Sequence, residues 1–286
     1  MNFKNIFSII RPHQWLKNIL VFPLFFLNYK SFEIFLTFDP LLIFISFSVV
    51  ASGVYCANDV FDVKKDKKHP TKRFRPIASG DLSIYQGIVL AVVFISIGIC
   101  LSLFVNLSFF FIICFYLILN IFYNLILKKI VYIDVFVLTL FYIIRITSSA
   151  SLPEINLSYW FISFSFFLFL SLALLKKYID FNYKEYSDIK STSTLKELFF
   201  IFSAITFIAS ISVLISFFNS SHFIATYSKT YLIYFLIIPY FYWMMNIITA
   251  AKLGKIHGDP IIFTLTDRKS LFSIALSSLI LIVSII

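Results

Sequence analysis

Long runs of apolar residues, separated by short polar loops, constrain this chain more than any other feature of its sequence. Of its 286 residues, 60% are hydrophobic and only 13% are charged, and the mean hydropathy is +0.94. Several of the runs approach the ~20 apolar residues that a helix needs to cross the hydrocarbon core of a bilayer. The sequence therefore predicts an all-α, polytopic membrane protein, with residues 1–286 forming a single transmembrane catalytic domain.

About nine transmembrane helices are expected from these runs. The first run is the least regular, because Pro23, Lys30 and Glu33 interrupt it. No cleavable signal peptide is predicted, since no small-residue cleavage site precedes that run. The expected spans cover roughly residues 15–27, 41–57, 84–104, 109–127, 133–150, 159–175, 198–218, 231–251 and 271–286.

The charged residues lie mostly on one side of these expected helices. The chain has 24 Lys and Arg against 14 Asp and Glu, a net charge of +10. Most of the basic residues precede the first span or follow every second span, and cytoplasmic loops are the ones enriched in Lys and Arg. The N-terminus and these loops are therefore predicted to face the cytoplasm from the inner (plasma) membrane. The positive charge then reflects membrane topology and predicts no nucleic-acid partner, and the acids on the same face predict a cytoplasmic active site.

An acidic motif, N-D-x-x-D-x-x-x-D, directly follows the second expected span. If that helix continues, Asn58, Asp62 and Asp66 fall on one face at intervals of four residues, with Asp59 beside them. Mg²⁺ commonly binds one or two carboxylates together with substrate phosphates. The motif therefore predicts a Mg²⁺ site made by these four residues, and the competing interpretation is a solvated loop with internal Lys–Asp pairs.

Basic residues follow the acidic motif at once. Lys72, Arg73 and Arg75 lie in the proline-bracketed stretch 69–76, and the forked guanidinium of Arg suits phosphate recognition. Contact with lipid headgroups is the alternative for this loop, and His69 is expected to be a structural residue. Lys17, next to Trp15 at the start of the first span, is either a further phosphate-binding residue or an interfacial anchor.

The fourth and fifth spans are bracketed by polar side chains at Tyr123, Lys128, Asp134 and Arg145. Asp134 and Arg145 are separated by about three helical turns and so return to nearly the same face. Arg145 is the deepest charge in the chain, and an intramembrane Arg normally faces the bundle interior and has a partner. Its expected role is phosphate binding, with a structural ion pair as the alternative.

A second charged cluster ends the sixth span, where Lys176, Lys177 and Asp180 follow one another closely. A site for two phosphorylated substrates needs such a cluster facing the first. The alternative is that these long side chains only extend toward the headgroups from a helix end. In the last polar loop, Asp259 is expected to cap a short helix that begins at Pro260.

Taken together, these motifs resemble the UbiA-type intramembrane prenyltransferase superfamily, and more closely its decaprenyl-phosphate phosphoribosyltransferase branch. The acidic motif marks the superfamily, whereas HPTKRFRPIASG is specific to the branch. The resemblance covers nearly the whole chain. It is carried by RPHQWLKN at 11–18, HPTKRFRPIASG at 69–80, YNLILKKIVYIDVFVL at 123–138 with Arg145, KKYID at 176–180, and the DP and DR pairs at 259–260 and 267–268.

The resemblance implies a UbiA-like helical bundle and a reaction. Enzymes of that branch transfer a 5-phosphoribosyl group from phosphoribosyl pyrophosphate to a polyprenyl phosphate, releasing pyrophosphate with the help of Mg²⁺, to supply precursors of cell-envelope glycans. The resemblance implies that the first acidic motif holds Mg²⁺ and the pyrophosphate. The basic residues then hold the other phosphates, an apolar cavity takes the polyprenyl tail, and Asp59, Asp62, Asp66 and Asp180 are catalytic.

Two departures separate this chain from the wider superfamily, and two other functions remain open. The superfamily usually carries a second D-x-x-x-D motif, but residue 184, four after Asp180, is Lys, and the closer branch usually has Glu at position 180. This disfavours the second function, a prenyltransferase that moves a polyprenyl group from its diphosphate to an aromatic acceptor in a quinone or haem pathway. The third, a transporter or flippase of lipid-linked intermediates, is disfavoured because the charges gather on one face.

Overall fold

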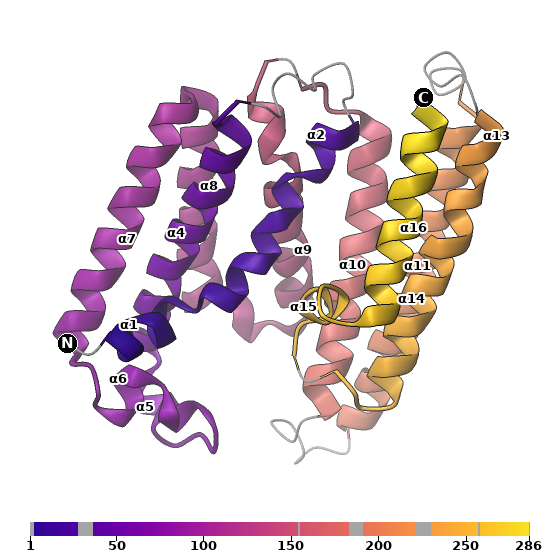
Figure 1. Ribbon diagram of the computed structural model, residues 1–286. Coiled ribbons are helices and arrows are strands. Elements are labelled where there is room, and N and C mark those ends of the chain that lie inside the picture. The colour runs from indigo at the N-terminus through magenta and orange to yellow at the C-terminus, as the bar shows by residue number, and fades with distance from the viewer. Residues whose placement is uncertain are drawn as a thin grey trace. The chain divides into compact units, whose positions relative to one another are not determined.

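The computed structural model describes residues 3–27, 37–153, 155–182, 191–220, 230–256 and 258–285. Every regular element among these residues is a helix, as Figure 1 shows. Seven of the described helices are long and apolar enough to cross a membrane. The expectation of an all-α membrane protein is therefore confirmed, and the seven helices correspond to the second through eighth expected spans.

The seven spans are contributed by long helices, several of which continue into short 3₁₀ turns. They cover Asp39–Phe61 (α4), Ile84–Val105 (α7), Leu107–Leu125 (α8), Val131–Ser151 (α9, Val131–Thr147, with η5, Ser148–Ser151), Tyr159–Phe181 (in α10, Tyr159–Asn182), Thr194–Phe218 (in α11, Ser191–Phe218) and Tyr234–Lys252 (η6, Tyr234–Leu236, with α14, Ile237–Lys252).

The first and last expected spans differ from the expectation. In the region of the first span, the chain forms a 3₁₀ helix at Pro12–Val21 (η1) and a short α-helix at Pro23–Leu27 (α2), because Pro23 has no amide hydrogen to continue a helix. The weak extension toward residue 36 lies outside the described residues. The last span corresponds to α16, Arg268–Ile285, which begins three residues earlier than expected, with two basic residues.

The described chain divides into two compact units. Unit 1 comprises residues 1–137 and 144–157, and unit 2 comprises residues 138–143 and 158–286. The middle of α9 therefore belongs to unit 2, although its two ends belong to unit 1. That residues 1–286 form one catalytic domain stays a prediction.

Unit 1 is built around the pair α4 and α7, which lie side by side over most of their lengths (Figure 1). Gly53 of α4 lies so close to α7 that an added methyl group would lie 2.6 Å from Ile95 Cγ1 and 3.0 Å from the Ala91 carbonyl oxygen. Gly98 of α7 approaches Val50 of α4 in the same way. Small residues let helix backbones approach closely inside membranes, so these glycines fix the position of α4.

Short elements surround the polar end of α4 and position the residues that follow it. They are α1 (Phe3–Ile10), α5 (Val63–Asp66), η3 (Lys72–Phe74) and α6 (Pro76–Ser79). Ile9 of α1, Cys56 of α4 and Ile77 of α6 pack in one buried cluster with Leu82 and Ala91. This cluster anchors both ends of the charged loop 62–75, so that its side chains are held near the end of α4.

Unit 2 is built around the antiparallel pair α10 and α11, with α14 packed on α16 (Figure 1). Ser171 of α10 and Ser203 of α11 are buried, and each donates its hydroxyl to the other's backbone carbonyl, at 2.8 and 3.0 Å. The short helices α13 (Thr230–Ile233) and α15 (Pro260–Thr264) flank these pairs. Asp259 caps α15 by accepting a hydrogen bond from the Ile261 amide at 3.0 Å, which confirms that expectation.

Candidate active site

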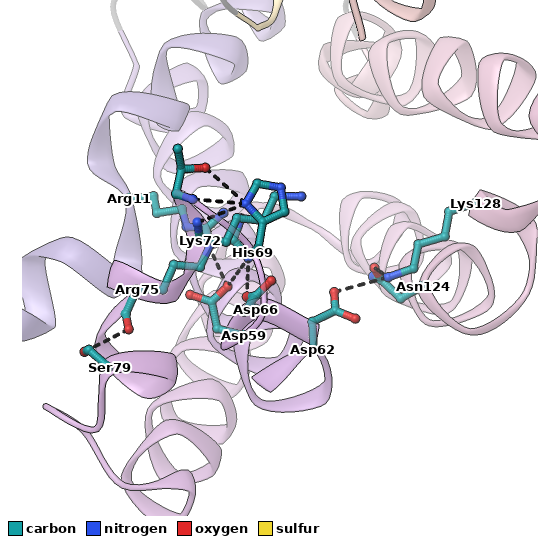
Figure 2. A network of polar contacts seen from close by, with 11 residues as sticks. Arg11, Asp59, Asp62, Asp66, His69, Lys72, Arg75, Ser79, Asn124 and Lys128 are labelled. Atoms are coloured by element: carbon teal, nitrogen blue, oxygen red, sulfur yellow. Dashed lines mark hydrogen bonds and ion pairs between the residues drawn. The ribbon is translucent and has the colours of Figure 1, made fainter. Parts of the chain in front are cut away.

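The acidic motif lies where α4 ends, and the helix does not continue straight through it. Asp59 is in the last turn of α4, Asp62 is the residue between α4 and α5, and Asp66 ends α5. Asp59 and Asp66 are buried, at 2% and 3% exposure, whereas one third of the Asp62 side chain is exposed. The condition for one shared face therefore fails, because the break at Asp62 leaves Asp59 and Asp66 together and turns Asp62 away from them, toward Lys128 (Figure 2).

Two arginines hold the buried carboxylates. Arg75 donates from Nη1 to Asp66 Oδ2 at 2.7 Å and to Asp59 Oδ1 at 3.1 Å. Arg11, which lies between α1 and η1, donates from Nη2 to the same Asp59 Oδ1 at 2.5 Å. The other carboxylate oxygen of Asp59, Oδ2, is buried and has no hydrogen-bond partner among the described residues. Buried polar atoms nearly always have a partner, so this oxygen suggests that a ligand belongs beside it.

The third carboxylate has a partner far away in sequence. Lys128, in η4 (Leu127–Lys129), places its Nζ 3.3 Å from Asp62 Oδ2 and 3.5 Å from Asn124 Oδ1 (Figure 2). About one third of each side chain of this ion pair is exposed. Nearby, Tyr123 donates its hydroxyl to Asp134 Oδ1 at 2.8 Å. The structure thus brings Lys128 to the acidic motif. It also pairs Tyr123 with Asp134, which lie on either side of Lys128 in the sequence.

The rest of the basic loop is arranged differently from Arg75. His69 Nδ1 lies 3.2 Å from the backbone nitrogens of Thr71 and Lys72, so the ring closes the turn, as expected of a structural residue. Arg73 is exposed and its guanidinium lies over the Phe74 ring, 4.8 Å from the ring centre. Of the three predicted phosphate-binding residues in this loop, the structure brings only the Arg75 side chain to the carboxylates by a described contact.

A line of polar contacts joins η1 to α4, farther from the C-terminal end of α4 than the carboxylates. Trp15 donates to Ser52 Oγ at 2.9 Å, and Asn18 donates to Ser48 Oγ at 3.1 Å. Trp15 is therefore bonded to α4, although an interfacial position was one expectation for it. Lys17 lies between these two contacts in sequence and is half-buried.

Arg145 continues this line of polar contacts, because it bonds Asn18. It donates from Nε to Asn18 Oδ1 at 2.8 Å and from Nη2 to the Tyr116 hydroxyl at 2.8 Å, and it is only 6% exposed. The expectation of an interior position with partners is confirmed. Asp134 is eleven residues away on α9, about 16 Å along the axis, so the two charges lie at different depths. A phosphate-binding role for Arg145 stays a prediction.

Unit 2 has its own polar cluster at the end of α10. Lys176 Nζ lies 3.8 Å from Asp259 Oδ2, which also accepts a hydrogen bond from the Tyr142 hydroxyl at 2.9 Å. Lys177 is buried and Asp180 is half-buried. That this cluster and the carboxylates of unit 1 form one site stays a prediction.

Arg11 is the site residue that sequence reasoning missed. From the sequence it is included only as the first residue of the motif RPHQWLKN and is assigned no role, although it contacts Asp59 48 residues away. One local signal was present, because Pro12 follows it and a residue before proline is kept out of the right-handed helical region. That restriction predicts a break at Arg11, between α1 and η1, but nothing local identifies Asp59 as its partner.

The described carboxylates suit a divalent cation by their chemistry, although the described residues contain no group of three His, Cys, Asp or Glu gathered as a metal cluster. Hard cations such as Mg²⁺ prefer carboxylate oxygens. Asp59 Oδ2 is buried without a partner and Asp62 is partly exposed, so both have an oxygen to offer. The predicted set of Asn58, Asp59, Asp62 and Asp66 as joint ligands stays a prediction.

Comparison with known proteins agrees with this architecture. The model of the UbiA prenyltransferase family matches residues 19–257. The chain belongs to the UbiA prenyltransferase family. With seven described helices that can cross a membrane, it is a multi-pass membrane protein of that family.

Three known proteins are similar to the chain. An uncharacterized protein, y4nM, of Sinorhizobium fredii is 29% identical over 277 residues, covering 94% of this chain and 54% of that protein. The decaprenyl-phosphate phosphoribosyltransferase of Mycobacterium tuberculosis (strain H37Rv) is 34% identical over 188 residues, covering 63% of this chain and 61% of that protein. This chain therefore spans less than two thirds of the length of either relative. A UbiA homologue from Archaeoglobus fulgidus, solved bound to GPP and Mg²⁺, superimposes with a TM-score of 0.69 at 16% identity, covering 96% of this chain and 99% of that one.

Proposed function

We propose that this protein transfers a 5-phosphoribosyl group from phosphoribosyl pyrophosphate to a polyprenyl phosphate of the decaprenyl type and releases pyrophosphate. The observation that carries the proposal is the cluster at the end of α4, where carboxylates and guanidinium groups meet around a buried, unpartnered oxygen of Asp59. A relative named for this activity supports it. The product is expected to serve cell-envelope glycan synthesis.

The reaction exchanges one bond at the anomeric carbon of ribose for another. An oxygen of the lipid phosphate attacks that carbon, and the bond from the carbon to the pyrophosphate oxygen breaks. The lipid phosphate is already an anion, so the attack needs no dedicated general base. The difficult part is the charge that develops on the departing pyrophosphate, and catalysis therefore depends on positive groups aimed at it.

Mg²⁺ is the expected cofactor, held by Asp59 and Asp62 with Asp66 and Asn58 as further candidates. When bound, it would neutralise charge on the leaving pyrophosphate as a Lewis acid. Because Asp66 is buried against Arg75, it serves first to orient that arginine.

The cationic residues divide into two groups under this proposal. Arg75 and Lys128 lie against the acidic motif and would bind the donor's phosphates, since charge-assisted bonds to phosphate are the strong ones. The remaining predicted phosphate-binding residues would contact the 5-phosphate or the lipid phosphate, and Asp180 would take part in catalysis from unit 2. Tyr123 and Asp134 would position this region. Besides Arg75 and Lys128, the predicted phosphate-binding residues are Lys17, Lys72, Arg73, Arg145, Lys176 and Lys177.

The proposed orientation follows from the charged loops. The loop after α4, the turn at Lys128 and the end of α10 all carry basic residues. By the positive-inside rule we propose that these ends, the N-terminus and the active site face the cytoplasm from the plasma membrane. A water-soluble donor would then reach the site from the cytoplasm, and the lipid acceptor from the inner leaflet.

A second candidate is transfer of a prenyl group from its diphosphate to an aromatic acceptor. The observation in its favour is the fold match to a structure bound to GPP, a prenyl diphosphate, and Mg²⁺. Both candidates need a cation and a diphosphate at the acidic motif. They differ in which substrate carries the diphosphate, so the choice can be made by assay.

The test uses purified protein, Mg²⁺, a panel of polyprenyl phosphates and donor labelled at two places. A ¹⁴C label in ribose should move to the organic phase, whereas a ³²P label in the β-phosphate should stay in water as pyrophosphate. Transfer of the ¹⁴C label and release of ³²P-pyrophosphate from the donor, measured by chromatography of the aqueous phase, should both depend on Mg²⁺, and Asp59→Asn should abolish both. Transfer of neither label to any polyprenyl phosphate would overturn the proposal, and an assay with prenyl diphosphates and aromatic acids would then test the second candidate.

A further inference from the structure

Arg11 is held in an unusual conformation at the edge of the acidic cluster. Its φ of 51° and ψ of 61° lie in the left-handed region, and among the described residues no other non-glycine residue has a positive φ. Such a backbone persists only where surrounding contacts enforce it, and it is frequent at functional sites. Here the contacts are the bond to Asp59 and the stacking of the guanidinium over Tyr55, 5.2 Å from the ring centre.

The two arginines of the cluster are not equivalent. Arg75 bonds two carboxylates, Asp59 and Asp66, whereas Arg11 bonds Asp59 alone among the described residues. A guanidinium has five N–H donors, and the described hydrogen bonds of Arg11 use one nitrogen, Nη2. One fifth of its side chain is exposed. Arg11 therefore has donors to offer a ligand and a single carboxylate to release.

Charge balance links this arginine to a cation. Arg11 and Arg75 carry two positive charges, which match the two negative charges of Asp59 and Asp66. A divalent cation at Asp59 Oδ2 would bring two further positive charges to the carboxylate that Arg11 already holds, and like charges this close repel. Of the two guanidinium groups, Arg11 has less to keep it in place. The excess charge left by the cation matches that of an incoming phosphate.

We propose that Arg11 and a divalent cation compete for Asp59, and that the displaced guanidinium binds a phosphate group of the substrate. The cation and the phosphate then strengthen each other's binding, because the cation frees the arginine that the phosphate uses. When no cation is bound, Arg11 acts as a counter-ion of the buried Asp59 carboxylate, whose Oδ2 has no partner among the described residues. The inference rests on the Mg²⁺ site of the proposed function.

The experiment measures Mn²⁺ binding to purified protein in detergent by electron paramagnetic resonance, with and without inorganic phosphate. Phosphate is the anion probe because pyrophosphate would chelate Mn²⁺ in solution. In Arg11→Met, Mn²⁺ should bind about fivefold more tightly or better without phosphate, the lower end of ordinary coupling between two ligands. Added phosphate should tighten Mn²⁺ binding to the wild type and have little effect on this variant.

Lys68→Met is the matched control, because Lys68 is exposed in the charged loop 62–75 and its substitution removes one positive charge without touching Asp59. Its Mn²⁺ affinity should change by less than about twofold, since exposed charges are screened by salt. Arg11→Lys is the second variant if Arg11→Met does not fold. It keeps the charge and loses the fork, so its Mn²⁺ affinity should stay near that of the wild type while the phosphate effect falls.

The outcomes separate this inference from the function on which it rests. Weaker Mn²⁺ binding in Arg11→Met than in Lys68→Met, or equal binding in the two, would overturn the competition and leave the metal site intact. Retention of the full phosphate effect in Arg11→Lys would overturn the phosphate role. If neither the wild type nor Arg11→Met binds Mn²⁺, or if Asp59→Asn binds it equally well, the Mg²⁺ site fails together with the inference.

Discussion

The two units each bury a carboxylate beside basic side chains, but the two carboxylates are used differently. In unit 2, both oxygens of Asp259 have partners, Oδ1 in the cap of α15 and Oδ2 with Tyr142 and Lys176. In unit 1, two guanidinium groups share Oδ1 of Asp59 while Oδ2 has no partner.

This difference indicates which charged cluster can rearrange around a ligand. A carboxylate that ends a helix and has both oxygens bonded stabilises the fold, and displacing its partners would unravel a helix end. A carboxylate with one crowded and one unpartnered oxygen can accept a cation without breaking secondary structure. The comparison therefore predicts that substitutions in unit 1 change activity first, and that substitution of Asp259 in unit 2 changes stability first.

The largest effect is expected for Asp62→Ala. Asp62 is partly exposed, and its described side-chain contact is the ion pair with Lys128, so the variant should fold. Its turnover should fall by about 100-fold or more, as when one electrostatic group of an active site is removed. Steady-state assays with a Mg²⁺ titration would measure this. Near-normal activity would remove Asp62 from the site, and Asp81→Ala, at an exposed acid that bonds Ser79, is the matched control.

Arg75→Lys is expected to have the next largest effect. Lysine keeps the charge but loses the planar guanidinium, whose Nη1 bonds both Asp59 and Asp66 and whose other nitrogens can bond a phosphate. The apparent KM for one phosphorylated substrate should rise by about 10-fold or more, given ~1.5–3 kcal/mol for a hydrogen bond to a charged group. The check is to vary each substrate separately with the other in excess. If both KM values are unchanged, the loop has only a topological role.

For Asp259→Ala, the expected effect is on stability and not on chemistry. Loss of the cap of α15 should cost about 1 kcal/mol, and the ion pair between Lys176 and Asp259 is lost as well. Thermal unfolding in detergent would detect a lower Tm, whereas activity per folded molecule should stay within about threefold, because this carboxylate offers no open oxygen. Asp259→Asn, which keeps a capping oxygen, should restore most of the Tm. A large loss of activity with an unchanged Tm would contradict the comparison.

A smaller, pH-dependent effect is expected at Asp267 of unit 2. Burial raises the pKa of this carboxyl, but hydrogen bonds from Ser270 and Asn246 outweigh it and hold the pKa below the usual 3.8. A lowered folded-state pKa stabilises the protein above the unfolded-state pKa, and this contribution is lost as the pH falls below about 3.8. The Tm of Asp267→Asn should therefore fall less than that of the wild type between pH 6 and pH 3. Parallel curves for the two proteins would show that Asp267 does not contribute.

Much of the fold could be predicted from the sequence, because a membrane-spanning helix can be recognised from the local sequence alone. A helix that crosses a bilayer needs a continuous apolar stretch of fixed length, and seven expected spans met that condition. The first expected span, residues 15–27, is different, because the chain there forms the 3₁₀ helix η1 and the short helix α2 in place of one continuous helix. Pro12 and Pro23 were visible, but the 3₁₀ geometry of η1 depends on its side-chain bonds to Ser48 and Ser52 of α4.

The site was less predictable, because its geometry depends on contacts between distant segments. The acidic motif and Lys128 could be recognised by residue type, and Asp259 as a cap by its position before Pro260. Regular helical spacing predicted that the acids share one face of a continuous helix. The break at Asp62 instead separates Asp62 from Asp59 and Asp66, which both bond Arg75. Nothing local connects Arg11 with Asp59, and whether an arginine at a helix end binds lipid or a carboxylate depends on tertiary packing.

The close contact between α4 and α7 has a consequence for genetics. Gly53 precedes Asp59 by six residues, about 9 Å along α4, and an added methyl group there has no room against Ile95. Relief of that clash would tilt α4, and the tilt would carry Asp59 away from Arg75. A random mutagenesis screen for lost activity should therefore recover alleles at Gly53 and at Gly98, even though both lie in a contact between two helices.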